Sequence, residues 1–151
     1  AFSTENWNRP KDEVDGLMEL FVDKFTQMLS DPRVVDNKIN VTVVGDRTLI
    51  PPHVLEKIEA VEERTKDFHD YYMHIALAYG GRNEILEATK KDFNSIEELA
   101  QYFNRYFPDP DIIIRTGGQY RLSNFLLWQA AYAELFFIED LFPNLNENIL
   151  N

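Results

Sequence analysis

Two kinds of apolar segment alternate along this chain, and the alternation limits its fold more than any other feature. Ile39–Val44 and Ile112–Ile114 are short β-branched runs, which are typical of buried strands. Elsewhere apolar residues recur every three or four positions, as on one face of an amphipathic helix. Strands separated by helices favour a mostly parallel central sheet flanked by helices. We therefore predict an α/β fold, and the 151 residues suit a single domain.

The boundaries of the other elements follow from helix-starting residues and from turn residues. Pro10 suits the first turn of a helix, and Ser95 with Glu98 forms a capping box, in which each side chain satisfies an N–H group at a helix start. Phe2 and Ser3 resemble the end of a strand, so we expect further residues upstream. The remaining expected elements are helices over 10–30, 51–68, 82–91 and 95–107, strands over 74–79 and 133–138, and a short helix over 126–132.

Charge and composition exclude several classes of protein. The net charge of −11 repels polyanions, which weighs against a nucleic-acid binder. The chain has no cysteine, so disulfides and thiolate metal sites are excluded and a reducing, cytoplasmic location is expected. Its most apolar run, Phe125–Ile138, falls short of the about 20 residues that span a bilayer.

Arginines are concentrated where a parallel sheet binds its ligands. Such sheets bind beyond the carboxyl ends of their strands. Five of the eight arginines follow predicted strands, and a guanidinium suits bidentate contact with phosphate better than an ammonium does. The alternative is that these arginines pair with surface acids. The five are Arg9, Arg47, Arg82, Arg115 and Arg121.

The segment from Ile112 to Ala133 is the strongest candidate for an anion site. It contains two arginines and no acidic residue, inside an acidic protein. Gly117-Gly118 would let backbone N–H groups turn toward an anion, and Ser123-Asn124 could cap a following helix. Gly-Gly could also be only a turn.

Two further features have both a structural and a functional interpretation. The loop Ser3–Pro10 could be a polar connection in which Thr4 or Asn8 caps a helix, but Trp7 needs core or ligand to cover it. Glu134 is either a satisfied buried carboxylate or a metal ligand, and taken alone it favours the former.

Several motifs in register resemble the cis-prenyltransferase family, and within it the bacterial undecaprenyl diphosphate synthases. The likeness runs in order through nearly the whole chain. Its motifs are AFSTENWNRP at 1–10, AYGGRNEI at 78–85, IRTGGQYRLSNF at 114–125 and AYAELFF at 131–137.

This resemblance implies an enzyme that adds isopentenyl diphosphate repeatedly, in cis, to farnesyl diphosphate, making undecaprenyl diphosphate for cell-wall lipid carrier synthesis. It also implies Mg²⁺, a homodimer, peripheral contact with the inner membrane face, and an apolar tunnel between sheet and helices. One wall would be the Val14–Leu29 helix face, although such a stripe is more often plain core.

Residue roles also follow from the resemblance. Asn6 takes the catalytic position, but an amide is a poor base near pH 7, so we expect it to orient a substrate or diphosphate oxygen. Glu134 would bind Mg²⁺. The expected substrate-binding residues are Ser3, Thr4, Glu5, Trp7, Arg9, Arg115, Arg121, Leu122 and Ser123.

Three departures from the family pattern bear on activity. The amino-terminal Asp motif and the basic carboxyl-terminal tail are absent from these 151 residues, and Gln119 stands where the family often has Glu. We therefore expect this chain alone not to turn over and the intact protein to do so. A non-catalytic subunit that supports a partner, or a phosphosugar or nucleotide binder, remains as the alternative.

Overall fold

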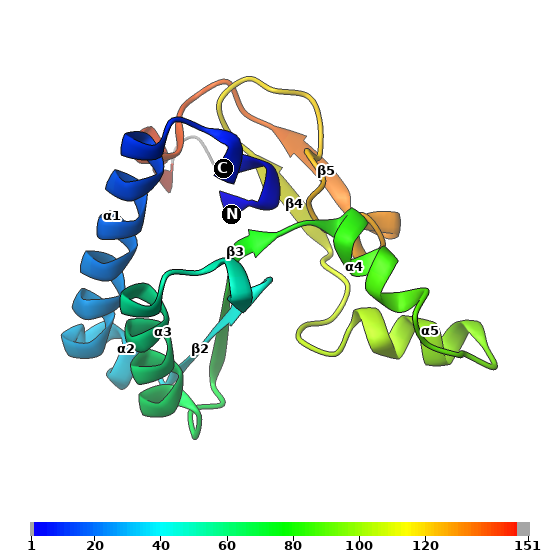
Figure 1. Cartoon of the computed structure of the whole chain (residues 1–151), viewed down its shortest axis with the longest axis horizontal. Helices are drawn as coiled ribbons and strands as arrows, with labels where there is room; N and C mark the ends of the chain where they lie inside the picture. Colours follow the sequence, from blue (N-terminus) through cyan, green and yellow to red (C-terminus); the bar gives the residue numbers. More distant parts are fainter. Residues whose placement is uncertain (1, 148–151) are drawn as a thin grey trace. The chain divides into compact units, whose positions relative to one another are not determined.

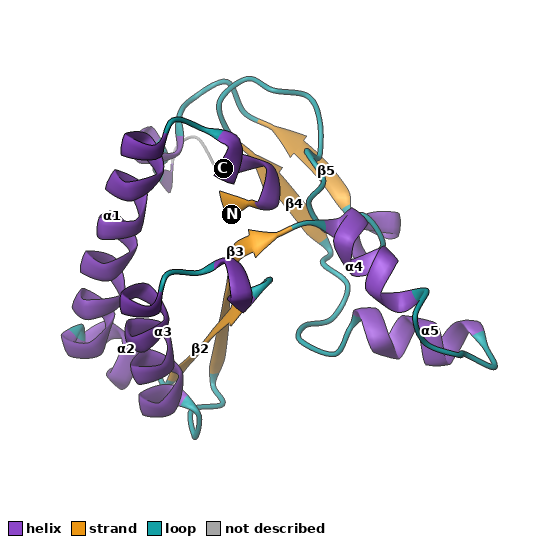
Figure 2. Ribbon diagram, in the orientation of Figure 1, coloured by secondary structure: helices purple, strands orange, loops and turns teal. Residues whose placement is uncertain are grey.

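The computed structural model describes residues 2–147, and its contacts divide the chain into two compact units. The first runs from Ala1 to Gly80 and the second from Gly81 to Asn151. Both are built from parallel strands and helices, so the α/β class is confirmed (Figures 1 and 2). No helix among residues 2–147 is long and apolar enough to cross a bilayer.

The first unit contains a three-stranded parallel sheet in the order β1-β3-β2. Helices α1 and α3 pack against each other, as Figure 1 shows, and α3 also packs on β2. The elements are β1 (Phe2–Ser3), η1 (Thr4–Asn8), α1 (Lys11–Ser30), α2 (Pro32–Asp36), β2 (Ile39–Val44), η2 (Arg47–Leu49), α3 (Pro52–Thr65) and β3 (Tyr71–Tyr79).

A single hydrophobic core holds these elements together. Phe25 of α1, Ile58 of α3 and Leu77 of β3 are among its fully buried side chains. Burying a side chain of this size contributes about 1.5–3 kcal/mol relative to leaving it exposed. Most of the α1 stripe that was a candidate tunnel wall therefore packs as core, with Met18 and Phe25 almost fully buried.

Strand β2 lies at the edge of its sheet, and α3 satisfies the N–H groups on its outer side. The Thr65 hydroxyl accepts the Val41 N–H at 3.1 Å, and the Glu62 carboxylate accepts the Val43 N–H at 2.8 Å. An edge strand with free N–H groups is a template for unwanted pairing. Here two side chains of α3 remove that liability.

The carboxyl end of β3 is bulged. The register with β1 shifts between Phe2 and Ser3, which leaves Ala78 without a partner in β1 and with a φ of 54°. Beside it, a Cβ on Gly45 would lie 1.9 Å from the Leu77 carbonyl oxygen, so only glycine fits there. These features fix the backbone where the predicted ligand-binding loops begin.

The second unit contains a two-stranded parallel sheet, β4–β5, with register Ile112↔Glu134 to Arg115↔Phe137. Trp128 stacks on the buried Phe103 of α5 with ring centroids 4.6 Å apart, and this contact packs α5 onto the segment that contains Trp128. The elements are α4 (Gly81–Ala88), α5 (Ile96–Phe103), β4 (Ile112–Arg115), η3 (Gln129–Tyr132), β5 (Glu134–Phe137) and η4 (Phe142–Asn144).

Some expectations about these elements were wrong in detail. Ile112 and Ile114 are 54% and 48% exposed, so β4 is not fully buried: alternate side chains of a strand share one face of the sheet, and this face is exposed. Phe68 and Phe107 lie beyond the ends of their helices. In the capping box, Ser95 accepts the Glu98 N–H as predicted, but the Glu98 carboxylate accepts the N–H of Asn94.

Candidate functional site

The loop after β1 is a short 3₁₀ helix held by Asn6. The Asn6 Oδ1 accepts hydrogen bonds from the Ser3 N–H at 2.8 Å and from the Ser3 hydroxyl at 2.9 Å. Because a backbone N–H can only donate, the atom facing it is the amide oxygen. The Asn6 nitrogen is therefore directed away from this contact and remains a donor for a ligand oxygen.

Trp7 packs against the core of the first unit. Its ring meets Phe2 edge-on with centroids 5.3 Å apart, and its partly buried side chain covers the core cluster. Its Nε1 is buried without a hydrogen-bond partner among the described residues. Trp7 was expected to be covered by either core or ligand, and the structure supports a core role for the ring.

Two of the five arginines that follow predicted strands lie in the first unit, and both pair with acidic residues, as the alternative interpretation expected. Arg9 forms an ion pair with Glu13 at 2.8 Å, and Arg47 forms one with Glu62 at 2.7 Å. The Arg9–Glu13 pair is exposed on both sides and contributes little stability, so a ligand could displace Glu13 from Arg9 at small cost. Thr4 and Glu5 lie beside each other in the same loop, with a 3.3 Å hydrogen bond between their side chains.

In the second unit, Arg115 and Ser123 come together as the sequence predicted. The Arg115 Nη1 donates to the Ser123 hydroxyl at 2.9 Å and to the carbonyl oxygen of Arg121. Arg115 is the last residue of β4, which places this cluster at the carboxyl end of the strand. Leu122 lies between the two contacts, half-buried.

The cluster keeps its positive charge. Within the described part of the second unit, neither Arg115 nor Arg121 forms an ion pair with a carboxylate. One nitrogen of Arg115 serves the loop, and the remaining guanidinium N–H groups are suited to oxygen acceptors of an anion. Arg115 and the Ser123 hydroxyl therefore present hydrogen-bond donors, with the charge of Arg121 in the same loop, inside an acidic protein.

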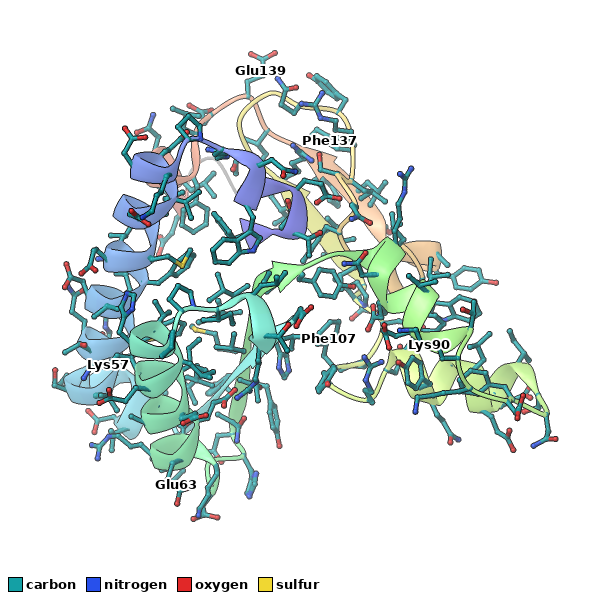
Figure 3. The ribbon with its side chains drawn as sticks, viewed as in Figure 1. Lys57, Glu63, Lys90, Phe107, Phe137 and Glu139 are labelled. Atoms are coloured by element: carbon teal, nitrogen blue, oxygen red, sulfur yellow. The ribbon has the colours of Figure 1, made fainter. Side chains whose placement is uncertain are left out.

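The expected role of Gly117 and Gly118 as N–H donors to that anion was wrong. The Gly117 N–H donates to the Asp140 carbonyl at 2.9 Å, and the Gly118 N–H donates to the Ile138 carbonyl at 3.1 Å. Both glycines have a positive φ, 86° and 64°, which lets the loop lie along the chain after β5. Figure 3 labels Phe137 and Glu139 in this region.

Asn124 was expected to cap the helix that follows it, and this was also wrong. Its carbonyl oxygen accepts the Gly81 N–H at 2.7 Å, and its Oδ1 accepts the Arg82 N–H at 2.8 Å. These are the first two N–H groups of α4, so Asn124 caps a helix that precedes it by 42 residues. Sequence reasoning found Asn124 but could not find so distant a partner.

Glu134 is exposed at the start of β5, so the interpretation as a buried carboxylate is wrong. It pairs in register with Ile112, whereas Arg115 pairs with Phe137 at the other end of the ladder. No group of three or more His, Asp or Glu that could hold a metal occurs within residues 2–147.

Comparison with known proteins decides the family. The model of the family described as "Putative undecaprenyl diphosphate synthase" matches residues 1–151. This chain belongs to that family. Since its members include cis-prenyltransferases, the resemblance drawn from the four motifs is confirmed.

Several curated relatives of this chain come from archaea. A tritrans,polycis-undecaprenyl-diphosphate synthase (geranylgeranyl-diphosphate specific) from Pyrococcus furiosus is 45% identical over 97% of this chain and 61% of its own length. The protein of the same description from Thermoplasma volcanium is 44% identical over 97% of this chain and 62% of its length. The chain thus spans about three fifths of the length of these relatives.

Solved structures agree on the fold. A probable undecaprenyl diphosphate synthase from Campylobacter jejuni is 39% identical, with a TM-score of 0.87 over 99% of this chain and 73% of that one. Lavandulyl diphosphate synthase from Lavandula x intermedia, solved with dimethylallyl diphosphate, is 32% identical, with a TM-score of 0.90 over 99% and 70% of the two chains. The α/β fold of the prenyltransferase family is therefore the fold of this chain.

Proposed function

We propose that this chain is part of a cis-prenyltransferase that condenses isopentenyl diphosphate with an allylic diphosphate. The observation that carries the proposal is the Arg115–Ser123 contact of 2.9 Å, with Arg121 in the same loop and no described carboxylate paired to either arginine. A diphosphate offers several oxygens to such donors. The family membership of residues 1–151 supplies the reaction class.

In this proposal the cluster holds the diphosphate of isopentenyl diphosphate. The Arg115 guanidinium and the Ser123 hydroxyl bind its oxygens from one side, and Arg121 binds from the same loop. In the first unit, Ser3 fixes the Asn6 oxygen, so the Asn6 nitrogen can orient a substrate or diphosphate oxygen. Such preorganised donors stabilise negative charge that grows on a diphosphate as the allylic C–O bond breaks, each by about 3 kcal/mol.

The allylic substrate is proposed at the level of its class. The resemblance suggested farnesyl diphosphate, whereas the archaeal relatives carry names that specify geranylgeranyl diphosphate. Incubating the full-length protein with labelled isopentenyl diphosphate and each allylic diphosphate decides between them. Products that lengthen by five-carbon units support the proposal, and no incorporation with either substrate, at any Mg²⁺ concentration, contradicts it and favours the non-catalytic subunit.

Arg121→Lys tests the binding cluster itself. Lysine keeps the charge but loses the planar fork, so the affinity for isopentenyl diphosphate should fall about tenfold or more. Arg64→Lys, on the exposed surface of α3, is the matched control and should leave that affinity unchanged. Equal affinities of the Arg121 variant and the wild type would remove Arg121 from the site.

From the resemblance we also propose that the protein binds Mg²⁺ with Glu134 as a ligand, forms a homodimer and contacts a membrane peripherally. Glu134→Gln in the full-length protein should raise the Mg²⁺ concentration needed for half-maximal rate, because the carboxylate charge is lost. Sedimentation equilibrium tests the dimer, and a monomer at micromolar concentration would contradict it. Flotation with anionic vesicles tests membrane contact.

A further inference from the structure

The loop that carries Ser123 has an unusual backbone. Ser123 and Asn124 both have a left-handed conformation, with φ of 48° and 63°, and Leu126 has a φ of 45°. Asparagine adopts this conformation with modest strain, but serine and leucine do so only where their surroundings enforce it. The hydroxyl that meets Arg115 is therefore presented by a turn that something else must hold.

Helix α4 holds that turn, through Asn124. Both oxygens of Asn124, one on the main chain and one on the side chain, accept the N–H groups of Gly81 and Arg82. The first N–H groups of a helix have no partner within it, so they bind an external acceptor strongly. Asn124 is thus fastened at two points to a rigid element.

Two other contacts dock the same loop on α4. A Cβ on Gly81 would lie 2.8 Å from the Leu127 side chain, so the absence of a side chain at Gly81 allows the loop to approach. Deeper in, the Gln129 Nε2 donates to the buried Glu84 carboxylate of α4 at 3.0 Å. The loop therefore lies on α4 from Asn124 to Gln129.

We propose that Asn124 is a positioning residue: by capping α4, it fixes the left-handed turn and so places the Ser123 hydroxyl against Arg115 for diphosphate binding. This inference rests on the proposed function of the Arg115–Ser123 cluster. It assigns α4 a function beyond packing, because its N-terminus sets the position of a substrate-binding hydroxyl. Asn124 itself acts through Ser123.

Three variants of the full-length protein separate the parts of this role. Asn124→Ala loses the side-chain cap and strains the turn, whereas Asn124→Gly loses the cap without straining the turn. Asn124→Asp keeps an oxygen acceptor and adds a charge that the helix N-terminus favours. We expect the KM for isopentenyl diphosphate to rise about tenfold in Asn124→Ala, less in Asn124→Gly, and little in Asn124→Asp. The KM for the allylic substrate should not change.

A double variant distinguishes positioning from simple loss of stability. If Asn124 acts through Ser123, Ser123→Ala combined with Asn124→Ala should bind isopentenyl diphosphate as weakly as Ser123→Ala alone. The matched control is Asn94→Ala, which removes a polar contact with Glu98 before α5 and should lower stability without changing KM. Additive effects of the two substitutions, or an unchanged KM in Asn124→Ala, would overturn the inference.

Hydrogen exchange at the Arg82 amide separates failure of this inference from failure of the proposed function. The amide should be protected in the wild type and exchange faster in Asn124→Gly. Binding of isopentenyl diphosphate by the wild type, with additive losses, would overturn only the positioning role. Absence of binding by the wild type would overturn both, and the exchange rate would then report whether the cap exists.

Discussion

Asn6→Asp separates the functions that a side chain at this position could perform. The Asn6 oxygen accepts two hydrogen bonds from Ser3, at 2.8 and 2.9 Å. Aspartate offers an oxygen in the same place, so the 3₁₀ loop after β1 should keep its conformation. What changes is the other end of the group, where a donor nitrogen becomes an oxygen that cannot donate and carries negative charge.

The expected loss of activity follows from the replacement of the donor nitrogen by a charged oxygen. A hydrogen bond to a charged acceptor contributes about 1.5–3 kcal/mol, which corresponds to about 10- to 150-fold. Repulsion between the new carboxylate and a diphosphate adds to this loss. We therefore expect kcat/KM for isopentenyl diphosphate to fall about 100-fold or more. Asn6→Ala loses the same donor and also both contacts with Ser3, so its activity should also fall well below that of the wild type.

Initial rates with labelled isopentenyl diphosphate, measured from about pH 6 to 9, provide the assay. If Asn6 were the base that removes a proton, aspartate with its ordinary pKa of about 3.9 would be ionised throughout and more basic than an amide. Activity of the Asn6→Asp protein at or above that of the wild type would therefore refute the donor role.

Two predictions concern the first unit alone. Thr65→Val should lower the free energy of unfolding by about 1–3 kcal/mol, because the buried Val41 would lose the acceptor for its N–H. Thr65→Ser keeps the hydroxyl and should lower it by about 1 kcal/mol. Equal losses for the two variants in urea unfolding would contradict this prediction. Burial lowers the pKa of His74 below its ordinary 6.5, so the folded protein binds fewer protons than the unfolded chain just below that pH. The stability contribution is complete above about pH 6.5 and is lost as the pH falls toward the folded value, and His74→Gln should remove this part of the pH dependence; identical pH profiles of stability would contradict it.

Local patterns predicted most of the elements. The β-branched run at 39–44 is β2 to the residue. Pro10 was expected in the first turn of α1 and is its N-cap, one residue earlier. The short helix α2 was missed, although Asp31 before Pro32 is a cap signal: its carboxylate accepts the Arg33 N–H at 2.9 Å. These features depend on residues close in sequence.

Contacts between distant residues could not be predicted in the same way. The grouping of Arg115 with Ser123 was predicted because both belong to one motif, at the carboxyl end of one strand. The cap on α4 was missed because Asn124 and Arg82 are 42 residues apart. The Gly117 and Gly118 N–H groups were assigned to a ligand because sequence gives no sign that carbonyls after β5 accept them.

The central claim is that Arg115, Arg121 and Ser123 together bind the diphosphate of isopentenyl diphosphate. The most direct measurement is NMR of the full-length protein during titration with isopentenyl diphosphate, following the guanidinium Nε–H signals of the two arginines and the Ser123 amide. We predict that all three signals shift together and saturate at one dissociation constant. Saturable binding that leaves all three signals unmoved would contradict the account.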